Sequence, residues 1–416
     1  MTHASTTNKT AVGTVTTIPG GIATPRGFRA AGVSAGIKAN NKPDLALLVS
    51  DAPAAAAASF TTNRVQAAPV LVSREALARS GGTARAIVVN SGCANACTGD
   101  EGLRHAREMA SETARLVNCP VEHVLVASTG VIGVALPIEK VRTGLSLAHR
   151  QLAAEQGPAA ARAIMTTDPF PKESAVELDL ASAGLGKILI GGMAKGSGMI
   201  EPMLATMLAF VTTDAAVPRS LLDRALREAV EDTFNAITVD GECSTNDSVM
   251  LLANGASGVT VDDSTYGAFV AGLTSVCHEL ALGIVRGGEG ATKLVKVIVT
   301  GAASAVEARR AAKAIANSPL VKTAIHGGDP NWGRLIAVAG RAGVELELSR
   351  AKVSIGSTVL FEDGRPHDEA APEAAEYLKG KELEVSVDLG SGRSESTVWT
   401  CDLSAEYVRI NADYRT

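Results

Sequence analysis

Aromatic residues and long apolar runs are scarce in this chain. Phe, Trp and Tyr make up only 3% of its 416 residues, although 46% are hydrophobic, so we expect a core built mainly from Ala, Val, Leu and Ile. No apolar stretch reaches about 18 residues, the length that a membrane-spanning helix needs. A net charge of −5 without a block of basic residues gives no electrostatic footprint for nucleic acid. Membrane spans and nucleic-acid binding are therefore not expected.

Cysteine and histidine patterns favour neither a disulfide framework nor a metal site. The 6 cysteines contain no Cys-x-x-Cys pair and the 7 histidines no His-x-x-x-His pair, so we expect reduced thiols and no bound metal. Residues 1–13 are polar and lack the apolar segment of a secretory signal, which indicates a cytoplasmic protein. A transit peptide stays open as an alternative, because this segment is rich in Thr and has no acidic residue.

Hydrophobic patterning predicts an α+β fold. Apolar runs predict strands at residues 45–49, 86–89, 123–127, 207–211, 248–253 and 294–300. Helical periodicity predicts helices at residues 100–117, 138–163, 218–234, 266–285 and 306–317. Further strands are expected in a hairpin at 176–180 and 187–190, and near the C-terminus at 352–360, 382–389, 396–403 and 407–410. This mixed order favours α+β layers over a doubly wound sheet.

The segment 195–208, with the sequence KGSGMIEPMLATML, carries the clearest chemical signal. Gly196, Gly198 and Pro202 disfavour a helix or a central strand before Thr206, and the apolar run after it predicts a strand. Thr206 is therefore expected at a loop-to-strand junction. A threonine that becomes the first residue of a new chain gains an α-amine that can act as its own base, which is the N-terminal threonine form of nucleophilic catalysis.

This segment resembles the self-cleavage segment of the ornithine acetyltransferase family, the bifunctional glutamate N-acetyltransferases of arginine biosynthesis. Seven further strings match family motifs in family order over nearly the whole chain: 90–99 (NSGCANACTG), 128–133 (STGVIG), 166–168 (TTD), 238–247 (TVDGECSTND), 288–293 (GEGATK), 328–334 (GDPNWGR) and 411–416 (NADYRT). The resemblance implies self-cleavage between Ala205 and Thr206. It also implies an alpha fragment (1–205) and a beta fragment (206–416) that form one intertwined body, with two copies of each in a heterotetramer.

The resemblance further implies which residues form the site. Thr206 would be the nucleophile that carries the acetyl group, and Thr129 and Gly130 would form the oxyanion hole through a hydroxyl and a backbone N–H. The substrate-binding residues implied by the matched motifs are Thr166, Lys195, Thr206, Glu289, Asn411 and Thr416. No role follows for residues 240–242 or 328–334, for which structural support is expected.

The activity implied by the resemblance is a ping-pong transfer of acetyl from N2-acetylornithine to glutamate through acetyl-Thr206, yielding ornithine and N-acetylglutamate. No cofactor is expected, and acetyl-CoA stays open as a further acetyl donor. The chain departs from the commonest family strings at Glu201, Cys93 and Cys243, and Glu201 could tune the maturation rate. Two alternatives remain. One is a self-processing aminopeptidase or amidase that passes its acyl group to water. The other is a nucleotide-binding regulatory protein, although the glycine loop at Lys195 lacks the P-loop order.

Overall fold

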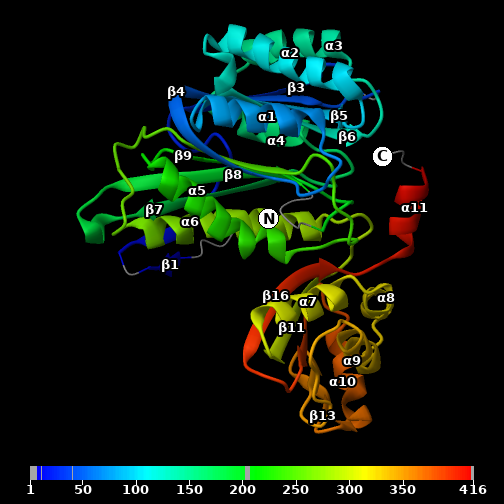
Figure 1. Cartoon of the computed structure of the whole chain (residues 1–416). Helices are drawn as coiled ribbons and strands as arrows, with labels where there is room; N and C mark the ends of the chain where they lie inside the picture. The colour runs from blue at the N-terminus through cyan, green and yellow to red at the C-terminus, as the bar shows by residue number, and fades with distance from the viewer. Residues whose placement is uncertain (1–6, 11, 40, 202–206, 414–416) are drawn as a thin grey trace.

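The chain forms two bodies, each built around its own β-sheet (Figure 1). The computed structural model describes residues 7–10, 12–39, 41–201 and 207–413. The larger sheet contains β1 (Thr7–Lys9), β2 (Thr14–Ile18), β3 (Phe28–Val33), β4 (Leu45–Phe60), β5 (Thr83–Cys93), β6 (Val124–Val131), β7 (Lys172–Asp179), β8 (Lys187–Lys195), β9 (Leu208–Thr213) and β10 (Ser248–Ala253). The smaller sheet contains β11 (Leu294–Ala302), β12 (Lys352–Ile355), β13 (Thr358–Glu362), β14 (Arg365–Pro366), β15 (Glu382–Asp388) and β16 (Ser394–Cys401). The expected α+β class is confirmed.

The sheet of the larger body folds over on itself into two layers, and helices on the outside make four layers in all (Figure 1). Its path runs β1-β2-β7-β8-β9-β10-β4-β5-β6, and β3 pairs with β4. Strand β4 is 16 residues long, and a register shift between Val49 and Ala54 lets it pair with β5 near its start and with β10 near its end. Small residues at 54–58 allow both faces of this strand to be covered closely. A single strand thus connects the two sheet layers.

Helices cover the two outer faces of these layers (Figure 1). These helices are α1 (Ala68–Arg79), α2 (Gly99–Val117), α3 (Ile138–Arg150), α5 (Arg219–Glu231) and α6 (Tyr266–Arg286). Helix α4 (Gly157–Ala163) instead contributes Ala160, Ala161 and Ala163 to the core between the sheet layers. Side chains along β9 alternate between two cores, as the pleat of a strand requires. Ala209 and Val211 belong to the core that includes α5 and α6, whereas Leu208 and Phe210 belong to the core between the sheet layers.

Helix α6 shows why an apolar helix need not indicate a membrane. The expectation that no apolar stretch is long enough to span a membrane is wrong for this helix, because its 21 residues contain an 18-residue window with a mean hydropathy of 1.7, which would allow it to cross one by length and composition alone. However, 61% of that apolar window is buried inside the protein, and residues such as Phe269, Leu273 and Leu280 form part of a core with strands of the larger sheet. We therefore interpret α6 as a core helix.

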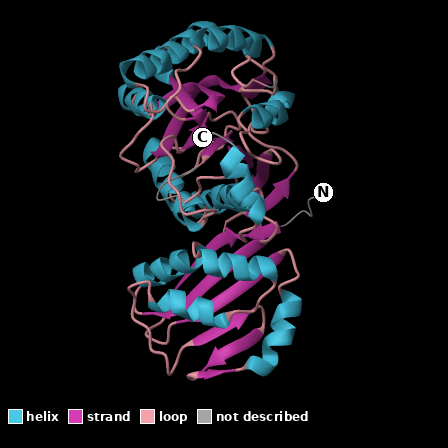
Figure 2. Cartoon of the chain, turned by 90° about the vertical axis from the view of Figure 1, so that its right-hand side faces the viewer, coloured by secondary structure: helices cyan, strands magenta, loops and turns pink. Residues whose placement is uncertain are grey.

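The smaller body follows Glu289 and packs its helices against the second sheet (Figure 2). These helices are α7 (Ala305–Ala316), α8 (Pro319–Gly327), α9 (Trp332–Gly340) and α10 (Ala371–Tyr377). The sheet order is β14-β13-β12-β15-β11-β16. The final helix α11 (Ala405–Asp413) leaves the end of β16 and returns beside the larger body (Figure 1). The two bodies are therefore connected twice by the chain.

The sheet of the larger body continues across the expected cleavage point. Strands β8 and β9 pair antiparallel, with Lys195 opposite Leu208. Residues before and after position 205 thus contribute neighbouring strands to one sheet. The expected fragments 1–205 and 206–416 do not coincide with the two bodies, and the fragment boundary itself stays a prediction.

Three local predictions are wrong. Residues 407–410 lie in helix α11 and not in a strand. The β-branched and aromatic side chains suggested a strand, but the helix places Tyr407 and Asn411 one turn apart on one face. The strand expected at 352–360 is two strands with Gly356 in the turn between them, at φ +58°. The helix expected at 138–163 is divided into α3 and α4.

Candidate functional site

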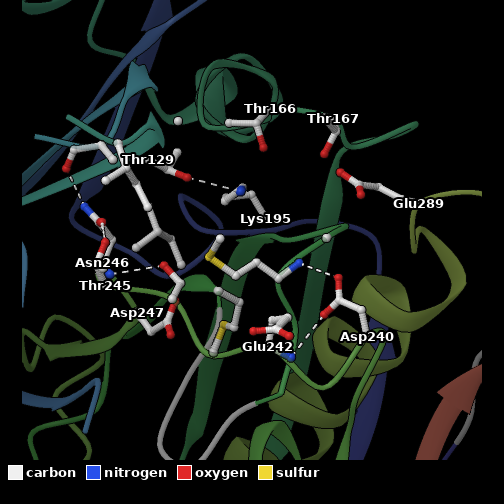
Figure 3. A pocket seen from close by; sticks show the side chains of 18 of the residues that line it. Thr129, Thr166, Thr167, Lys195, Asp240, Glu242, Thr245, Asn246, Asp247 and Glu289 are labelled. Atoms are coloured by element: carbon white, nitrogen blue, oxygen red, sulfur yellow. Dashed lines mark hydrogen bonds between the residues drawn. The ribbon is translucent and has the colours of Figure 1, made fainter. Parts of the chain in front are cut away.

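One cavity collects residues from segments that are far apart in the sequence (Figure 3). Its lining includes Thr129, Gly130, Thr166, Lys195, Glu289 and Asn411, which are all the predicted site residues that the structure describes. Ala205, Thr206 and Thr416 lie outside the described residues. Met207, the residue directly after Thr206, also lines the cavity. The predicted residues are thus brought together, and their individual roles stay predictions.

Thr129 and Gly130 lie near the end of β6, which pairs in parallel with β5. Gly130 has φ +129°, and a Cβ there would stand 2.4 Å from the carbonyl carbon of Gly92. Only glycine therefore allows this close approach of the two strands. The Thr129 hydroxyl accepts a hydrogen bond from Lys195 Nζ at 3.2 Å (Figure 3). Its own proton therefore remains available for donation into the cavity.

Lys195 is held near Thr166 by a buried carboxylate that the sequence analysis did not assign. Asp168 accepts hydrogen bonds from Lys172 Nζ at 2.5 Å, from Gly196 N at 2.7 Å and from Thr166 N at 2.9 Å. Burial alone would raise the pKa of Asp168, but the charges of Lys172 and Lys195 hold it well below its usual range. Asp168 is therefore ionised at neutral pH and fixes both the Thr166 loop and the chain that follows Lys195.

The partly buried Lys38 also contacts the loop that carries Thr166. Lys38 Nζ donates to the carbonyl oxygens of Pro43 at 2.8 Å and Met165 at 2.7 Å. Burial lowers the pKa of Lys38 to about 8, and the positive charge of Lys195 contributes to that lowering. Lys38 thus adds a second cation near the site, one that titrates close to neutral pH.

Glu289 provides a buried negative group on another side of the cavity (Figure 3). Its carboxylate accepts a hydrogen bond from Asn411 Nδ2 at 2.7 Å, and its backbone N–H donates to Ser197 O at 3.0 Å. A Cβ at Gly198 would stand 2.4 Å from Glu289 Oε2, so the absence of a side chain at position 198 makes room for this carboxylate. Lys195 contributes a basic group to the cavity lining, and Glu289 is one of four acidic residues there, with Asp240, Glu242 and Asp247. Groups of both signs suit a ligand that carries both charges.

The segment 238–247 contributes several residues to the cavity lining, although the sequence analysis expected only structural support from residues 240–242. Asn246 Nδ2 donates to Ala94 O at 2.6 Å and to Ser128 O at 2.9 Å. Ser128 in turn donates to Asn90 Oδ1 at 2.6 Å. These bonds connect three of the matched sequence strings, 90–99, 128–133 and 238–247. They thereby hold the end of β6, which carries Thr129, at the cavity.

Asp240 and Tyr407 are two further residues of the cavity lining that the sequence analysis did not assign to the site. Asp240 accepts hydrogen bonds from the N–H groups of Met199 and Ile200, both at 2.7 Å, and from the Tyr407 hydroxyl at 3.2 Å. Both side chains line the cavity. Asp240 lies in the matched string 238–247, so a sequence signal exists for it. Tyr407 lies in no matched string and was wrongly predicted to be in a strand.

The 328–334 string has a structural role in the smaller body. Asn331 caps α9 by accepting a hydrogen bond from Arg334 N at 3.1 Å. Trp332 stacks on Phe361 with ring centroids 4.9 Å apart. Within the described part of the chain, no group of three His, Cys, Asp or Glu residues is arranged to hold a metal ion.

Curated relatives match this chain over nearly its whole length. The arginine biosynthesis bifunctional protein ArgJ of Symbiobacterium thermophilum is 48% identical over 406 residues, which cover 96% of this chain and 99% of that protein. The protein of the same description from Geobacter sulfurreducens is 49% identical over 395 residues, with 94% and 99% covered.

Solved structures with related sequences cover about half of the chain. The arginine biosynthesis bifunctional protein argJ of Bacillus halodurans is 44% identical, covers 50% of this chain and all of the solved chain, and has a TM-score of 0.49. The ornithine acetyltransferase of Mycobacterium tuberculosis, solved in complex with ornithine, is 39% identical, covers 46% of this chain and all of that one, and has a TM-score of 0.42.

The family model described as the ArgJ family matches residues 29–416. This match confirms the resemblance stated from the sequence motifs. Together with the identity to the curated relatives, it shows that the chain belongs to the ArgJ family.

Proposed function

We propose that this chain is an acetyltransferase of arginine biosynthesis that moves an acetyl group from N2-acetylornithine to glutamate through Thr206. The observation that carries the proposal is the convergence of Thr129, Gly130, Lys195 and Glu289 on one cavity that Met207 also lines. Because Met207 follows Thr206 directly, the nucleophile is joined by one peptide bond to a residue of the cavity wall. Family membership supports the same reaction class.

The proposed maturation step makes the nucleophile. The Thr206 hydroxyl attacks the Ala205 carbonyl carbon, and the acyl group moves from nitrogen to oxygen to give an ester. Water then hydrolyses that ester, which leaves a carboxylate on Ala205 and a free α-amine on Thr206. This amine has an ordinary pKa of roughly 7.7–8.0, so a useful fraction is neutral near pH 7 and can take the hydroxyl proton.

In the transfer step, acetyl-Thr206 forms as ornithine leaves, and glutamate then attacks the acetyl group and departs as N-acetylglutamate. The negative charge that develops on the carbonyl oxygen requires fixed donors, which the Thr129 hydroxyl and the Gly130 N–H would supply. Lys195 would bind a substrate carboxylate, and Glu289, supported by Asn411, would bind the side-chain amine of ornithine. Thr166 and Thr416 would complete the substrate contacts.

The remaining parts of the proposal concern assembly and conditions. The alpha and beta fragments would stay together as a heterotetramer with two of each, in the cytoplasm. The half-reactions described above need no metal or organic cofactor, because both the nucleophile and its base come from Thr206. Acetyl-CoA would serve as an additional donor if the chain also makes N-acetylglutamate from free glutamate.

Intact-protein mass spectrometry followed by a product assay tests this function. We expect two fragments, the second beginning at Thr206, and N-acetylglutamate from acetylornithine and glutamate. The Thr206→Ala variant should remain a single inactive chain. Release of acetate and ornithine alone would favour the amidase alternative. A wild-type chain that keeps one mass near 42.5 kDa on incubation would refute the N-terminal nucleophile.

A further inference from the structure

Asp240 lies where the chain that approaches the cleavage point meets the C-terminal helix. Both of its carboxylate oxygens are engaged. Oδ1 accepts from Ile200 N at 2.7 Å and from Glu242 N at 3.3 Å. Oδ2 accepts from Met199 N at 2.7 Å and from the Tyr407 hydroxyl at 3.2 Å. A single carboxylate therefore contacts two segments that are about 200 positions apart in the sequence.

On one side, Asp240 fixes the last described residues before the Ala205–Thr206 junction. Met199 has φ +58°, in the left-handed region that a residue with a side chain rarely adopts. Hydrogen bonds from backbone N–H groups to a charged carboxylate are strong enough to stabilise this turn. Backbone bonds from Val239 N to Ile200 O at 2.7 Å and from Glu201 N to Glu242 O at 2.8 Å extend the same attachment. The Asp240 segment thus fixes the backbone of residues 199–201.

On the other side, Asp240 holds helix α11 against the cavity. Burial and the charge of Asp240 raise the pKa of Tyr407, so its phenol stays protonated and donates. Asn411 lies one turn further along α11 and donates to Glu289 at 2.7 Å. Within the described residues of α11, no side chain is buried, so the helix depends on such polar contacts for its place.

We propose that Asp240 is a positioning residue that holds both the approach to the cleavage point and the helix that orients Glu289. This inference rests on the proposed function, since it assumes cleavage before Thr206 and substrate binding at Glu289. It predicts two separable effects. Loss of the contacts to Met199 and Ile200 slows self-cleavage, and loss of the contact to Tyr407 weakens binding of the ornithine moiety.

Two variants separate these effects. Asp240→Asn keeps the size of the side chain but leaves one acceptor oxygen and turns an NH2 group toward N–H donors. Tyr407→Phe removes only the hydrogen bond that the Tyr407 hydroxyl of α11 donates to Asp240. The matched controls are Asp262→Asn and Tyr377→Phe. Asp262→Asn removes the charge of a carboxylate whose Oδ1 accepts hydrogen bonds from the backbone N–H groups of Ser264 and Thr265 at the far end of α6, and Tyr377→Phe loses a bond from Glu384 N in the smaller body.

Each chain is made by cell-free synthesis, and its cleavage is followed over time by intact mass. Steady-state kinetics are then measured per cleaved chain. We expect Asp240→Asn to cleave roughly tenfold more slowly and to raise the KM for acetylornithine, since hydrogen bonds to a charged group are of that strength. Tyr407→Phe should cleave at the wild-type rate but raise the same KM roughly tenfold. Both controls should behave as wild type.

Wild-type cleavage and KM in Asp240→Asn would overturn the proposal. So would a lower melting temperature with an unchanged KM, because that pattern indicates structural support alone. If Asp240→Asn does not fold, an unchanged KM in Tyr407→Phe would contradict the α11 part. If even the wild-type chain never cleaves, the proposed function fails first, and calorimetric titration with ornithine still tests whether Tyr407→Phe weakens binding.

Discussion

Replacing Gly198 by alanine should displace Glu289 and impair substrate binding with little loss of stability. A Cβ at position 198 would stand 2.4 Å from Glu289 Oε2, whereas ordinary contacts begin near 3.4 Å, so the carboxylate must move by about 3.4 − 2.4 = 1.0 Å. The backbone of residue 198 is not in the left-handed region, so alanine itself is tolerated. The strain is therefore relieved mainly by the Glu289 side chain.

The size of the effect follows from the contact that is lost. A hydrogen bond to a charged group contributes roughly 1.5–3 kcal/mol, which corresponds to about 10- to 150-fold in affinity at 1.4 kcal/mol per tenfold. We expect the KM for acetylornithine to rise within that range. The free energy of unfolding should change by less than about 1 kcal/mol, because the displaced group is the end of a flexible side chain.

The assay measures KM and kcat per cleaved chain, together with urea unfolding. Gly267→Ala is the matched control, since a Cβ there meets nothing within 4 Å. Glu289→Asp shortens the carboxylate by one methylene, so the double variant with Gly198→Ala should lose less than the sum of the two single losses. Strictly additive losses, or an unchanged KM in Gly198→Ala, would refute the reasoning.

Further predictions concern the oxyanion site and the partly buried Lys38. Thr129→Ala should lower both the self-cleavage rate and kcat by roughly 10²–10³-fold, the usual effect of losing one oxyanion donor, and equal rates in a stopped-flow acylation assay would contradict this. The pKa of Lys38 is lowered from 10.5 to about 8 in the folded protein, so between pH 8 and pH 10.5 the unfolded chain binds more protons than the folded one. The contribution of Lys38 to the free energy of unfolding therefore rises with pH in this range. The unfolding free energy of wild type relative to Lys38→Met should therefore increase from pH 7.5 to pH 10, and a flat difference would exclude this role.

The family resemblance of short sequence strings named candidate site residues that the structure then places around one cavity, and their roles stay predictions. Thr129 and Gly130 follow an apolar run, and Lys195 begins a glycine-rich loop. The need for glycine at positions 130 and 198 comes from close contacts with Gly92 and Glu289, which are distant in the sequence and are visible only in the structure. The local patterns alone indicated an ordinary turn at Thr129 and Gly130, and only the resemblance of the ordered strings singled these residues out.

Other features depend on distant contacts and could not be predicted from local patterns. Strand β4 changes partners at a register shift, which no periodicity in its own sequence encodes. Tyr407 lies in a run of β-formers, yet its place is decided by Asp240, which lies 167 residues away. Asp168 also accepts a hydrogen bond from Gly196 N, 28 residues away. The local spacing of Asp168, Thr166 and Lys172 does not predict this contact.

The pairing of β8 with β9 has a consequence for how the protein folds. Before the proposed cut between Ala205 and Thr206, these neighbouring strands belong to one molecule, and only a short connection between Lys195 and Leu208 must close. After the cut, the same hydrogen bonds would join two separate polypeptides, so reassembly from the unfolded state would become a second-order reaction that dilution slows. The cleaved protein would then stay folded because it unfolds slowly. Its correct fold would depend on the sheet having formed while the protein was still one chain.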